Sequence, residues 1–145
     1  CRDLSIHIAT RGKAACATEG HYTVPPNYAD HLRQLVAINE SHAGGGERTF
    51  LIEGDASRTL PQFLAENPQT IVSLAYFDFD LYEPTKNCLD LLIPRLTRGS
   101  IVAFDELVVG EFPGETTALI EAVGLGNIRL KRCPYGHCWS YFVVE

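Results

Sequence analysis

The feature that most constrains the fold is an alternation of short apolar runs with helix-like stretches between residues 48 and 124. The apolar runs at 49–53, 71–77 and 100–104 have the length of strands, and a stretch with helical spacing of apolar residues follows each of them. This order predicts parallel strands joined by right-handed helical crossovers. We therefore expect an α/β fold of the doubly wound, Rossmann-like class, with a mostly parallel sheet whose central strands are buried on both faces.

Four stretches have the pattern of helices, and they cover residues 25–41, 57–67, 83–99 and 114–124. Asn27 is a suitable N-cap for the first helix, with Asp30 three positions later as in a capping box. In the third helix, Gly99 is the expected C-terminal stop and Pro94 is expected to bend the last turns.

The two ends of the chain predict further strands. Residues 127–132 and 139–144 flank a tight "PYGH" turn, which predicts an antiparallel hairpin at the end of the sheet. Near the beginning, residues 4–10 form one more candidate strand. The glycines of "HAGGGER" precede a strand and do not link a strand to a helix, so a flexible loop is expected there and not a phosphate cradle.

Size, composition and charge restrict the class of partner. A length of 145 residues predicts one domain that covers 1–145, and 46% hydrophobic with 21% charged residues is ordinary for a soluble globular protein. No apolar run is long enough to span a membrane, and no secretory signal pattern opens the chain. The net charge of −6, without a cluster of Lys and Arg, argues against nucleic acid. A small-molecule partner is expected.

Cysteine usage predicts reduced thiols in the cytoplasm. Five cysteines at irregular spacings do not resemble the disulfide framework of a secreted protein. Cys133, His137 and Cys138 lie close together, which leaves zinc as an alternative, but zinc needs a fourth ligand and the terminal hairpin accounts for all three residues. The chain begins with Cys and contains no Met, so it is expected to lack its own start.

Four carboxylates follow two of the buried apolar runs. The run in "IVSLAYFDFDLYEPT" ends in Asp78 and Asp80, and the run in "GSIVAFDELV" ends in Asp105 and Glu106. Parallel strands end at the same edge of a sheet, and ligands bind in the crevice outside those ends. If the two strands are neighbours, Asp78 and Asp105 lie side by side, and their repulsion favours a shared proton or a bound cation. An all-oxygen cluster suits Mg²⁺. The alternative, that these residues only cap the following helices or are solvated, stays open.

Other residues have two interpretations each. Asp55 ends the run in "EGDAS" and either contacts a ligand hydroxyl or amine, or caps the helix that starts near Ser57. His21 either serves as a base on a substrate-facing loop or is simply exposed. Lys86 either reaches the crevice or lies on a solvated helix face, which is the preferred interpretation. Tyr82 is a candidate for the pocket wall, whereas Tyr76 and its neighbouring aromatics are expected in the core.

A long segment of the chain resembles a known family. The segment is "GDASRTLPQFLAENPQTIVSLAYFDFDLYEPTKNCLDLLIPRLTRGSIVAFDEL", and the later "FPGETTALIEAVGL" and "SYFVVE" fit the same group. These residues resemble the S-adenosylmethionine-dependent O-methyltransferases of the macrocin type, which act on sugars of natural products. The resemblance covers about residues 17–145, and "DFDLYEPTK" and "FDEL" are its specific parts.

The resemblance implies a fold, a reaction and a set of site residues. The fold is the class I methyltransferase sheet with an antiparallel final strand, and the reaction is methyl transfer to a hydroxyl that Mg²⁺ holds. By resemblance, the metal ligands are Asp78, Asp105 and Glu106, where relatives commonly have Asp-Asp for the last pair. Asp55 and the adjacent Ala56 fall where this fold contacts the adenosine part of S-adenosylmethionine. Asp80 belongs to the same acidic motif and either supports the metal ligands from behind or acts as the catalytic base.

The beginning of the chain departs from the family pattern. No strand–glycine loop–helix unit of the kind that cradles the cofactor is recognisable before residue 48. The sequence therefore predicts an N-terminally truncated methyltransferase domain, with little affinity of this chain alone for S-adenosylmethionine. The strand at 71–77 would then have an open edge, which residues 4–10 or a second copy in a homodimer are expected to cover.

Two other functions remain as alternatives at the level of sequence. "DFD" is a DxD motif, which also occurs in metal-dependent glycosyltransferases and phosphotransferases. The missing N-terminal unit instead favours a non-catalytic, truncated methyltransferase fold that acts in binding or assembly.

Overall fold

The fold is described from a computed structural model that covers residues 25–42, 48–135 and 139–145 in detail. Some sequence predictions lie outside these residues, namely the strand at 4–10, the candidate base His21, and His137 with Cys138 of the zinc alternative. Cys88 and Cys133 lie within them, and both are free thiols.

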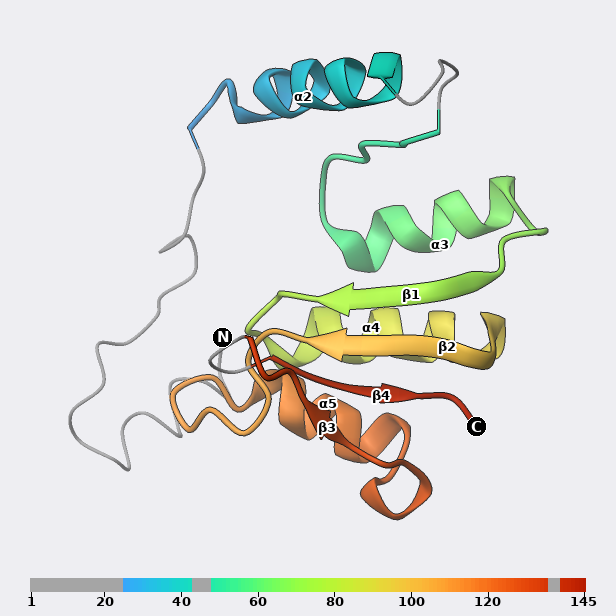
Figure 1. Cartoon of the computed structure of the whole chain (residues 1–145), viewed down its shortest axis with the longest axis vertical. Helices are drawn as coiled ribbons and strands as arrows, with labels where there is room; N and C mark the ends of the chain where they lie inside the picture. The colour runs from blue at the N-terminus through green and yellow to red at the C-terminus, as the bar shows by residue number, and fades with distance from the viewer. Residues whose placement is uncertain (1–24, 43–47, 136–138) are drawn as a thin grey trace.

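A mixed sheet of four strands forms the centre of the described part of the chain (Figure 1). Its order is β1-β2-β4-β3, with β1 (Val72–Phe77), β2 (Leu96–Phe104), β3 (Lys131–Arg132) and β4 (Ser140–Val143). β1 and β2 are parallel, whereas β4 is antiparallel to both β2 and β3. The α/β class is confirmed, and so are the parallel pairing of the two acidic-ended strands and the antiparallel terminal hairpin.

Helices α4 (Tyr82–Leu92) and α5 (Gly114–Ala122) lie side by side against one face of this sheet (Figure 1). The core lies between the sheet and these two helices. Its buried residues are Ala75, Phe77, Cys88, Leu89, Val102, Phe104, Leu107, Ala118, Leu119 and Phe142. α3 (Ala56–Glu66) packs beside α4 and contributes the buried Leu64. Two short 3₁₀ turns, η1 (Ile93–Arg95) and η2 (Leu125–Asn127), complete the connections.

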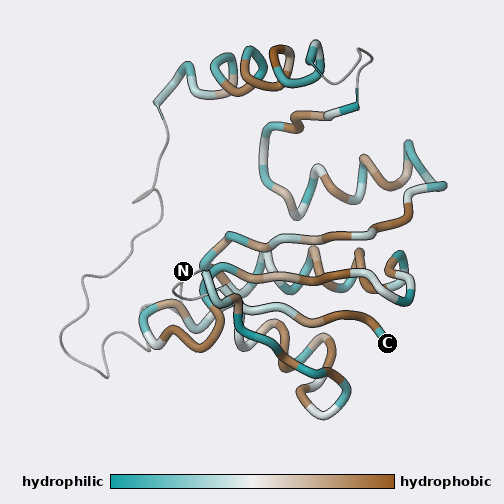
Figure 2. Tube along the Cα trace, viewed as in Figure 1, coloured by the Kyte–Doolittle hydropathy of each residue, from teal (hydrophilic) through white to brown (hydrophobic). Residues whose placement is uncertain are grey.

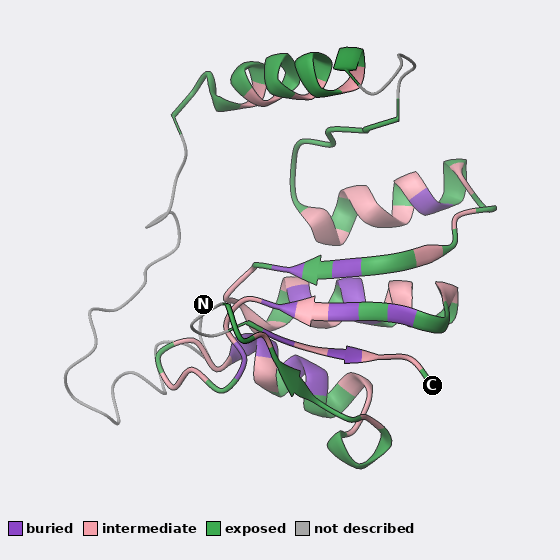
Figure 3. Cartoon of the chain, in the orientation of Figure 1, coloured by how far each residue is buried: buried purple, intermediate pink, exposed green. Residues whose placement is uncertain are grey.

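The opposite face of the sheet is open, so the prediction that β1 is buried on both faces was wrong. Ala75 and Phe77 point into the core, but Leu74 and Tyr76 are 61% and 50% exposed (Figure 3). The physical reason is that α4 and α5 cover one face only, and no helix of the described residues packs over Leu74 and Tyr76. Among the described residues β1 is also an edge strand, because it pairs there with β2 alone.

The strand expected at 49–53 is not formed. No strand lies beside these residues in the part of the chain that the structure describes, and a strand requires a neighbour for its N–H and C=O groups. At the start of this segment the backbone bonds to helix α2 (Tyr28–His42) instead: the amides of Arg48 and Thr49 both donate to Glu40 Oε1, each over 2.7 Å. The segment is therefore tied to a helix and not to the sheet.

The helix expected at 83–99 is shorter than predicted, because α4 ends at Leu92. Pro94 has no N–H to continue the helical hydrogen bonds, and the chain instead makes the turn η1 and enters β2 at Leu96. Gly99 is not a helix stop. It lies within β2 with a φ of 88°, in the bulge between the Val72–Leu96 and Leu74–Ile101 pairs.

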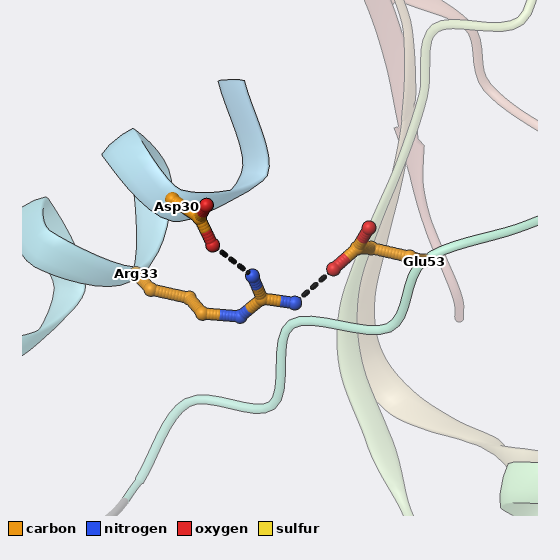
Figure 4. Close-up of polar contacts among 3 residues, drawn as sticks. All are labelled: Asp30, Arg33 and Glu53. Carbon is orange, nitrogen blue, oxygen red and sulfur yellow. Dashed lines mark hydrogen bonds and ion pairs between the residues drawn. The ribbon is translucent and has the colours of Figure 1, made fainter. Parts of the chain in front are cut away.

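The helix predicted at 25–41 is confirmed as α2 (Tyr28–His42), and the Asn27 carbonyl accepts the amide of His31 at its start. α2 lies apart from the sheet, and none of its residues is buried although hydrophobic residues recur along it (Figures 1 and 2). Arg33 holds it to the 49–53 segment by contacting both Asp30 and Glu53 (Figure 4). Both ion pairs are exposed, so each stabilises the protein by only about 0–1 kcal/mol.

In the parts that the structure describes, no helix is both long and apolar enough to cross a membrane.

Candidate active site

The two acidic strand ends meet at one edge of the sheet. Phe77 and Phe104, the last residues of β1 and β2, are register partners, and their rings stack with centroids 5.1 Å apart. One residue further, the amide of Asp105 donates to the carbonyl of Phe77 over 3.0 Å. Asp78 and Asp105 therefore leave neighbouring parallel strands at the same point, which is the placement that the sequence predicts.

The carboxylates at this edge affect one another electrostatically. Burial raises the pKa of Asp78, and the charge of Asp105 raises it further. Burial also raises the pKa of Asp80, with added contributions from Asp78 and Asp105. The pKa of Glu106 is raised by burial and then by the other three carboxylates and Glu111. Each shift means that the charged form is disfavoured, so the cluster is stabilised by a proton or a cation.

A three-ligand metal cage is not formed by the described residues. No group of three or more His, Cys, Asp or Glu side chains among them is arranged to hold a metal ion. One oxygen of Asp105, Oδ1, accepts a hydrogen bond from the hydroxyl of Tyr76. Mg²⁺ commonly binds through one or two carboxylates and completes its shell with water and substrate oxygens. The chemistry of the donor set therefore fits this cation, although its three expected ligands do not converge.

Asp80 has an unusual backbone conformation. Its φ is 59°, in the left-handed region that few residues other than Gly adopt and that Asp tolerates better than most. Asp80 is also half-buried, whereas Asp78 is exposed by surface area and is only partly removed from water. A residue held in this region is often part of a site, because the surrounding structure must maintain the conformation.

Comparison with known proteins identifies the family. The model of the methyltransferase domain family matches residues 7–107, which is well over half of the chain. The chain belongs to this methyltransferase domain family.

Two solved structures of CalS11 resemble this methyltransferase domain. One is the apo structure of CalS11, named as a TDP-rhamnose 3′-O-methyltransferase of calicheamicin biosynthesis, with 43% identity over 84% of the chain and a TM-score of 0.78. The other is a structure of CalS11 named as a calicheamicin methyltransferase, with 40% identity over 93% of the chain and a TM-score of 0.84. The chain spans 54% of the CalS11 chain in each case, about half of its length. No match was found among curated proteins.

In the methyltransferase domain, Asp55 is a helix cap. Its Oδ1 accepts the amide of Ser57 over 2.9 Å, and its Oδ2 lies 3.6 Å from Arg58 Nε. The next residue, Ala56, lines an apolar pocket of about 380 Å³ between α3 and β1, together with Phe77 and Phe79. A larger pocket of about 710 Å³ lies between α2, the 49–53 segment and α3, and none of the four clustered carboxylates lines it. None of the four carboxylates lines the smaller pocket either, but Phe77 and Phe79, the residues on either side of Asp78, do line it, so it is the pocket nearer to the acidic strand end.

Two candidates from the sequence are engaged elsewhere. Lys86 contacts Asp90 one helical turn away, but its side chain is only 23% exposed, so it does not lie on a fully solvated helix face. The hydroxyl of Tyr82 donates to Glu121 Oε2 of α5. Tyr76 was expected in the core but is half-exposed and contacts Asp105 instead.

Glu115 is the residue that sequence reasoning missed. It is fully buried in the first turn of α5, and it accepts the amides of Phe79 over 3.0 Å and Glu106 over 3.1 Å. Burial raises its pKa to about 7, against the lowering effect of these hydrogen bonds. A signal was present in the sequence: Ala118, Leu119 and Ala122 follow Glu115 by three, four and seven positions and share its helical face, so this face carries a carboxylate into the core.

Proposed function

We propose that this methyltransferase domain takes part in S-adenosylmethionine-dependent, Mg²⁺-assisted methyl transfer to a hydroxyl of a sugar or a similar natural-product acceptor. The observation that carries the proposal is the meeting of the 78–80 and 105–106 carboxylates at one end of two parallel strands. The identity of 40–43% to CalS11, whose printed name specifies a sugar hydroxyl, supports the acceptor class.

Asp78, Asp105 and Glu106 are the proposed holders of Mg²⁺. The cation, when bound, lowers the pKa of a coordinated hydroxyl and orients it. The pKa values of Asp78 and Glu106 are raised by burial and then by repulsion from neighbouring carboxylates, and a bound cation would offset both effects, which supports this role. Glu106 is one methylene longer than the aspartate that is common at this position in the family it resembles, so its carboxylate extends further from the strand end.

Asp80 is the proposed general base. Asp80 is half-buried, and the pKa of its carboxyl is raised. A general base works best when its pKa lies near the working pH, because it is then still charged and accepts a proton readily. The neighbouring Asp78 and Asp105 contribute to the raised pKa of Asp80 by their charge. In this role Asp80 takes the proton of the acceptor hydroxyl, while the methyl group is supplied by the cofactor.

Asp55 and Ala56 are the proposed contacts of the adenosine part of the cofactor. The apolar wall at Ala56 suits a flat heterocycle, and an exposed carboxylate at Asp55 suits a ribose hydroxyl or an exocyclic amine. Asp55 would keep its role as the cap of α3, because a carboxylate has several lone pairs for acceptance.

The test is methyl transfer by the purified protein. We expect mass spectrometry to find a singly methylated product from S-adenosylmethionine and a nucleotide sugar such as TDP-rhamnose, and EDTA to abolish the product until Mg²⁺ is restored. Calorimetry with S-adenosylhomocysteine and with UDP-sugars, each with and without Mg²⁺, separates the alternatives. Binding of UDP-sugars alone, with sugar transfer, would support a glycosyltransferase, and no binding of any of these ligands would support a non-catalytic fold.

A further inference from the structure

The start of α5 touches both of the loops that carry the clustered carboxylates. We define the first loop as residues 78–81, after β1, and the second loop as residues 105–108, after β2. Glu115 Oε1 accepts the amide of Phe79 in the first loop, and Glu115 Oε2 accepts the amide of Glu106 in the second loop. One buried carboxylate therefore spans the gap between the two loops, one oxygen to each.

The residues on either side of Glu115 strengthen this junction. Gly114 packs so closely on the end of the first loop that an added Cβ would lie 2.5 Å from the carbonyl oxygen of Asp80 and 2.4 Å from the amide nitrogen of the next element's first residue, Tyr82. Thr116 Oγ1 accepts the amide of Val108 in the second loop over 2.8 Å. Gly114, Glu115 and Thr116 thus contact the two loops at three consecutive positions.

Both loops contain a residue whose backbone needs such support. Asp80 and Val108 have φ values of 59° and 66°, and Val is β-branched, so the left-handed region is costly for it. Conformations of this kind persist only where the surrounding contacts hold them. The contacts that do so come from one helical turn of α5.

We propose that Glu115 is a positioning residue that sets the spacing between the 78–81 and 105–108 loops, and with it the spacing between Asp80 and the Asp78, Asp105 and Glu106 carboxylates. The effect of this spacing on Mg²⁺ binding and methyl transfer rests on the proposed function, whereas the contacts of Glu115 with the two loops do not. Glu115 itself does not reach the reacting groups: it is completely buried, and its two oxygens are occupied by backbone amides.

Three variants of the protein test the proposal. Glu115→Ala removes both acceptors. Glu115→Gln keeps the volume but leaves one acceptor oxygen, so it can satisfy only one of the two amides. Glu83→Gln makes the same chemical change in the first turn of α4, on an exposed glutamate, and is the matched control.

The first readout is hydrogen–deuterium exchange, which needs neither metal nor activity. We expect Glu115→Ala to speed exchange about tenfold or more in both loops while residues 100–104 keep the wild-type rate, and Glu115→Gln to speed it in one loop more than in the other. Glu83→Gln should leave both loops unchanged. Faster exchange in no loop, or an equal increase across the whole protein, would overturn the proposal. If Glu115→Ala does not fold, Glu115→Gln supplies the comparison alone.

The second readout separates positioning from a merely structural role. Where the wild type binds Mg²⁺, we expect Glu115→Ala to weaken that binding about tenfold and to lower kcat with little change in the KM of the acceptor. Loosened loops with unchanged Mg²⁺ affinity and kcat would overturn the positioning role. If the wild type binds no Mg²⁺, the proposed metal site has failed, and the exchange data alone then decide on Glu115.

Discussion

The hydroxyl of Tyr76 donates a hydrogen bond to Asp105 Oδ1 across the β1–β2 boundary. Tyr76 points to the open face of the sheet, and Asp105 follows the last residue of the neighbouring strand. Burial, the hydrogen bond to Asp105 and the nearby negative charges raise the pKa of Tyr76 well above its usual value. The hydroxyl therefore stays protonated at neutral pH and remains a donor that orients one proposed metal ligand.

Tyr76→Phe tests this relationship. Loss of one hydrogen bond to a carboxylate is expected to weaken Mg²⁺ binding about threefold to tenfold, because Asp105 is no longer held in one orientation. Calorimetry measures the effect, and Tyr135→Phe is the control since Tyr135 is 94% exposed. An increase in Mg²⁺ affinity would mean instead that the hydroxyl competes with the cation for Asp105.

Asp78→Asn tests the metal site more directly. The substitution keeps the shape and removes the charge, so we expect the Kd for Mg²⁺ to rise about tenfold or more. Glu83→Gln loses a charge on the nearby first turn of α4 and should change the Kd less than about twofold, because a solvated charge at a distance is screened. Equal effects of the two substitutions would argue that Asp78 is not a ligand.

Asp80→Asn tests the proposed base. Asn tolerates the left-handed backbone at this position, so the loop should keep its conformation. Loss of a general base is expected to reduce the methyl-transfer rate about 10²- to 10⁴-fold, with a smaller effect on Mg²⁺ binding than Asp78→Asn has. Asp90→Asn, which changes an exposed aspartate on α4, is the control for the rate measurement. A rate within a few-fold of the wild type would exclude Asp80 as the base.

The stability of the metal-free protein should depend on pH through Glu115. The pKa of this carboxyl is raised from 4.5 to about 7 in the folded state, chiefly by burial. Its contribution to the free energy of unfolding is therefore fully present below about pH 4.5 and is lost as the pH rises through 7, with a total of roughly 3 kcal/mol at most.

Urea unfolding of the wild type and of Glu115→Gln at pH 5 and pH 8 isolates this contribution. Asp78, Asp80 and Glu106 also have raised pKa values, but they are present in both proteins and their effects cancel in the difference. We expect the stability advantage of the wild type over Glu115→Gln to be larger at pH 5 than at pH 8. A larger advantage at pH 8 would show that the hydrogen bonds to the ionised form outweigh its burial.

The open edge of β1 leads to a prediction about assembly. Within the described residues β1 pairs on one side only, and Leu74 and Tyr76 leave apolar area exposed beside that edge. Unpaired edges and apolar patches favour association. We expect sedimentation to find either a dimer or a monomer. If it finds a monomer, we expect hydrogen–deuterium exchange to show residues 4–10 protected as a paired strand. A monomer with unprotected 4–10 residues and an accessible β1 edge would contradict this expectation.

Much of the architecture followed from local sequence patterns. The apolar runs at 71–77 and 100–104, each followed by a helical pattern, predict β1, β2, α4 and α5, and the turn residues between 132 and 139 predict the terminal pairing of β3 and β4. The Phe-Asp endings of two such runs were enough to place Asp78 and Asp105 at one edge, because parallel strands end together. These features depend on residues close in sequence and on the geometry of parallel pairing.

The errors arose where a segment depends on a distant partner. Residues 49–53 have strand-like composition, but a strand forms only where another backbone supplies hydrogen bonds, and here the Glu40 carboxylate accepts the amide of Thr49 and that of the preceding Arg48. Burial of both faces of β1 likewise required a second covering layer, which residues 71–77 cannot specify themselves. Pro94 was visible in the sequence, yet only the pairing of Leu96 with Val72 shows that the chain joins the sheet immediately after it.

The sequence by itself therefore determined which carboxylates gather at the edge, since strand polarity and the position of each Asp after an apolar run are local properties. Only the tertiary structure decided what holds them there. Glu115 looks like an ordinary acidic residue in the first turn of a helix, where it complements the helix dipole. Packing of α5 against both loops instead buries it and gives its oxygens the amides of Phe79 and Glu106, which lie 36 and 9 positions away in the chain.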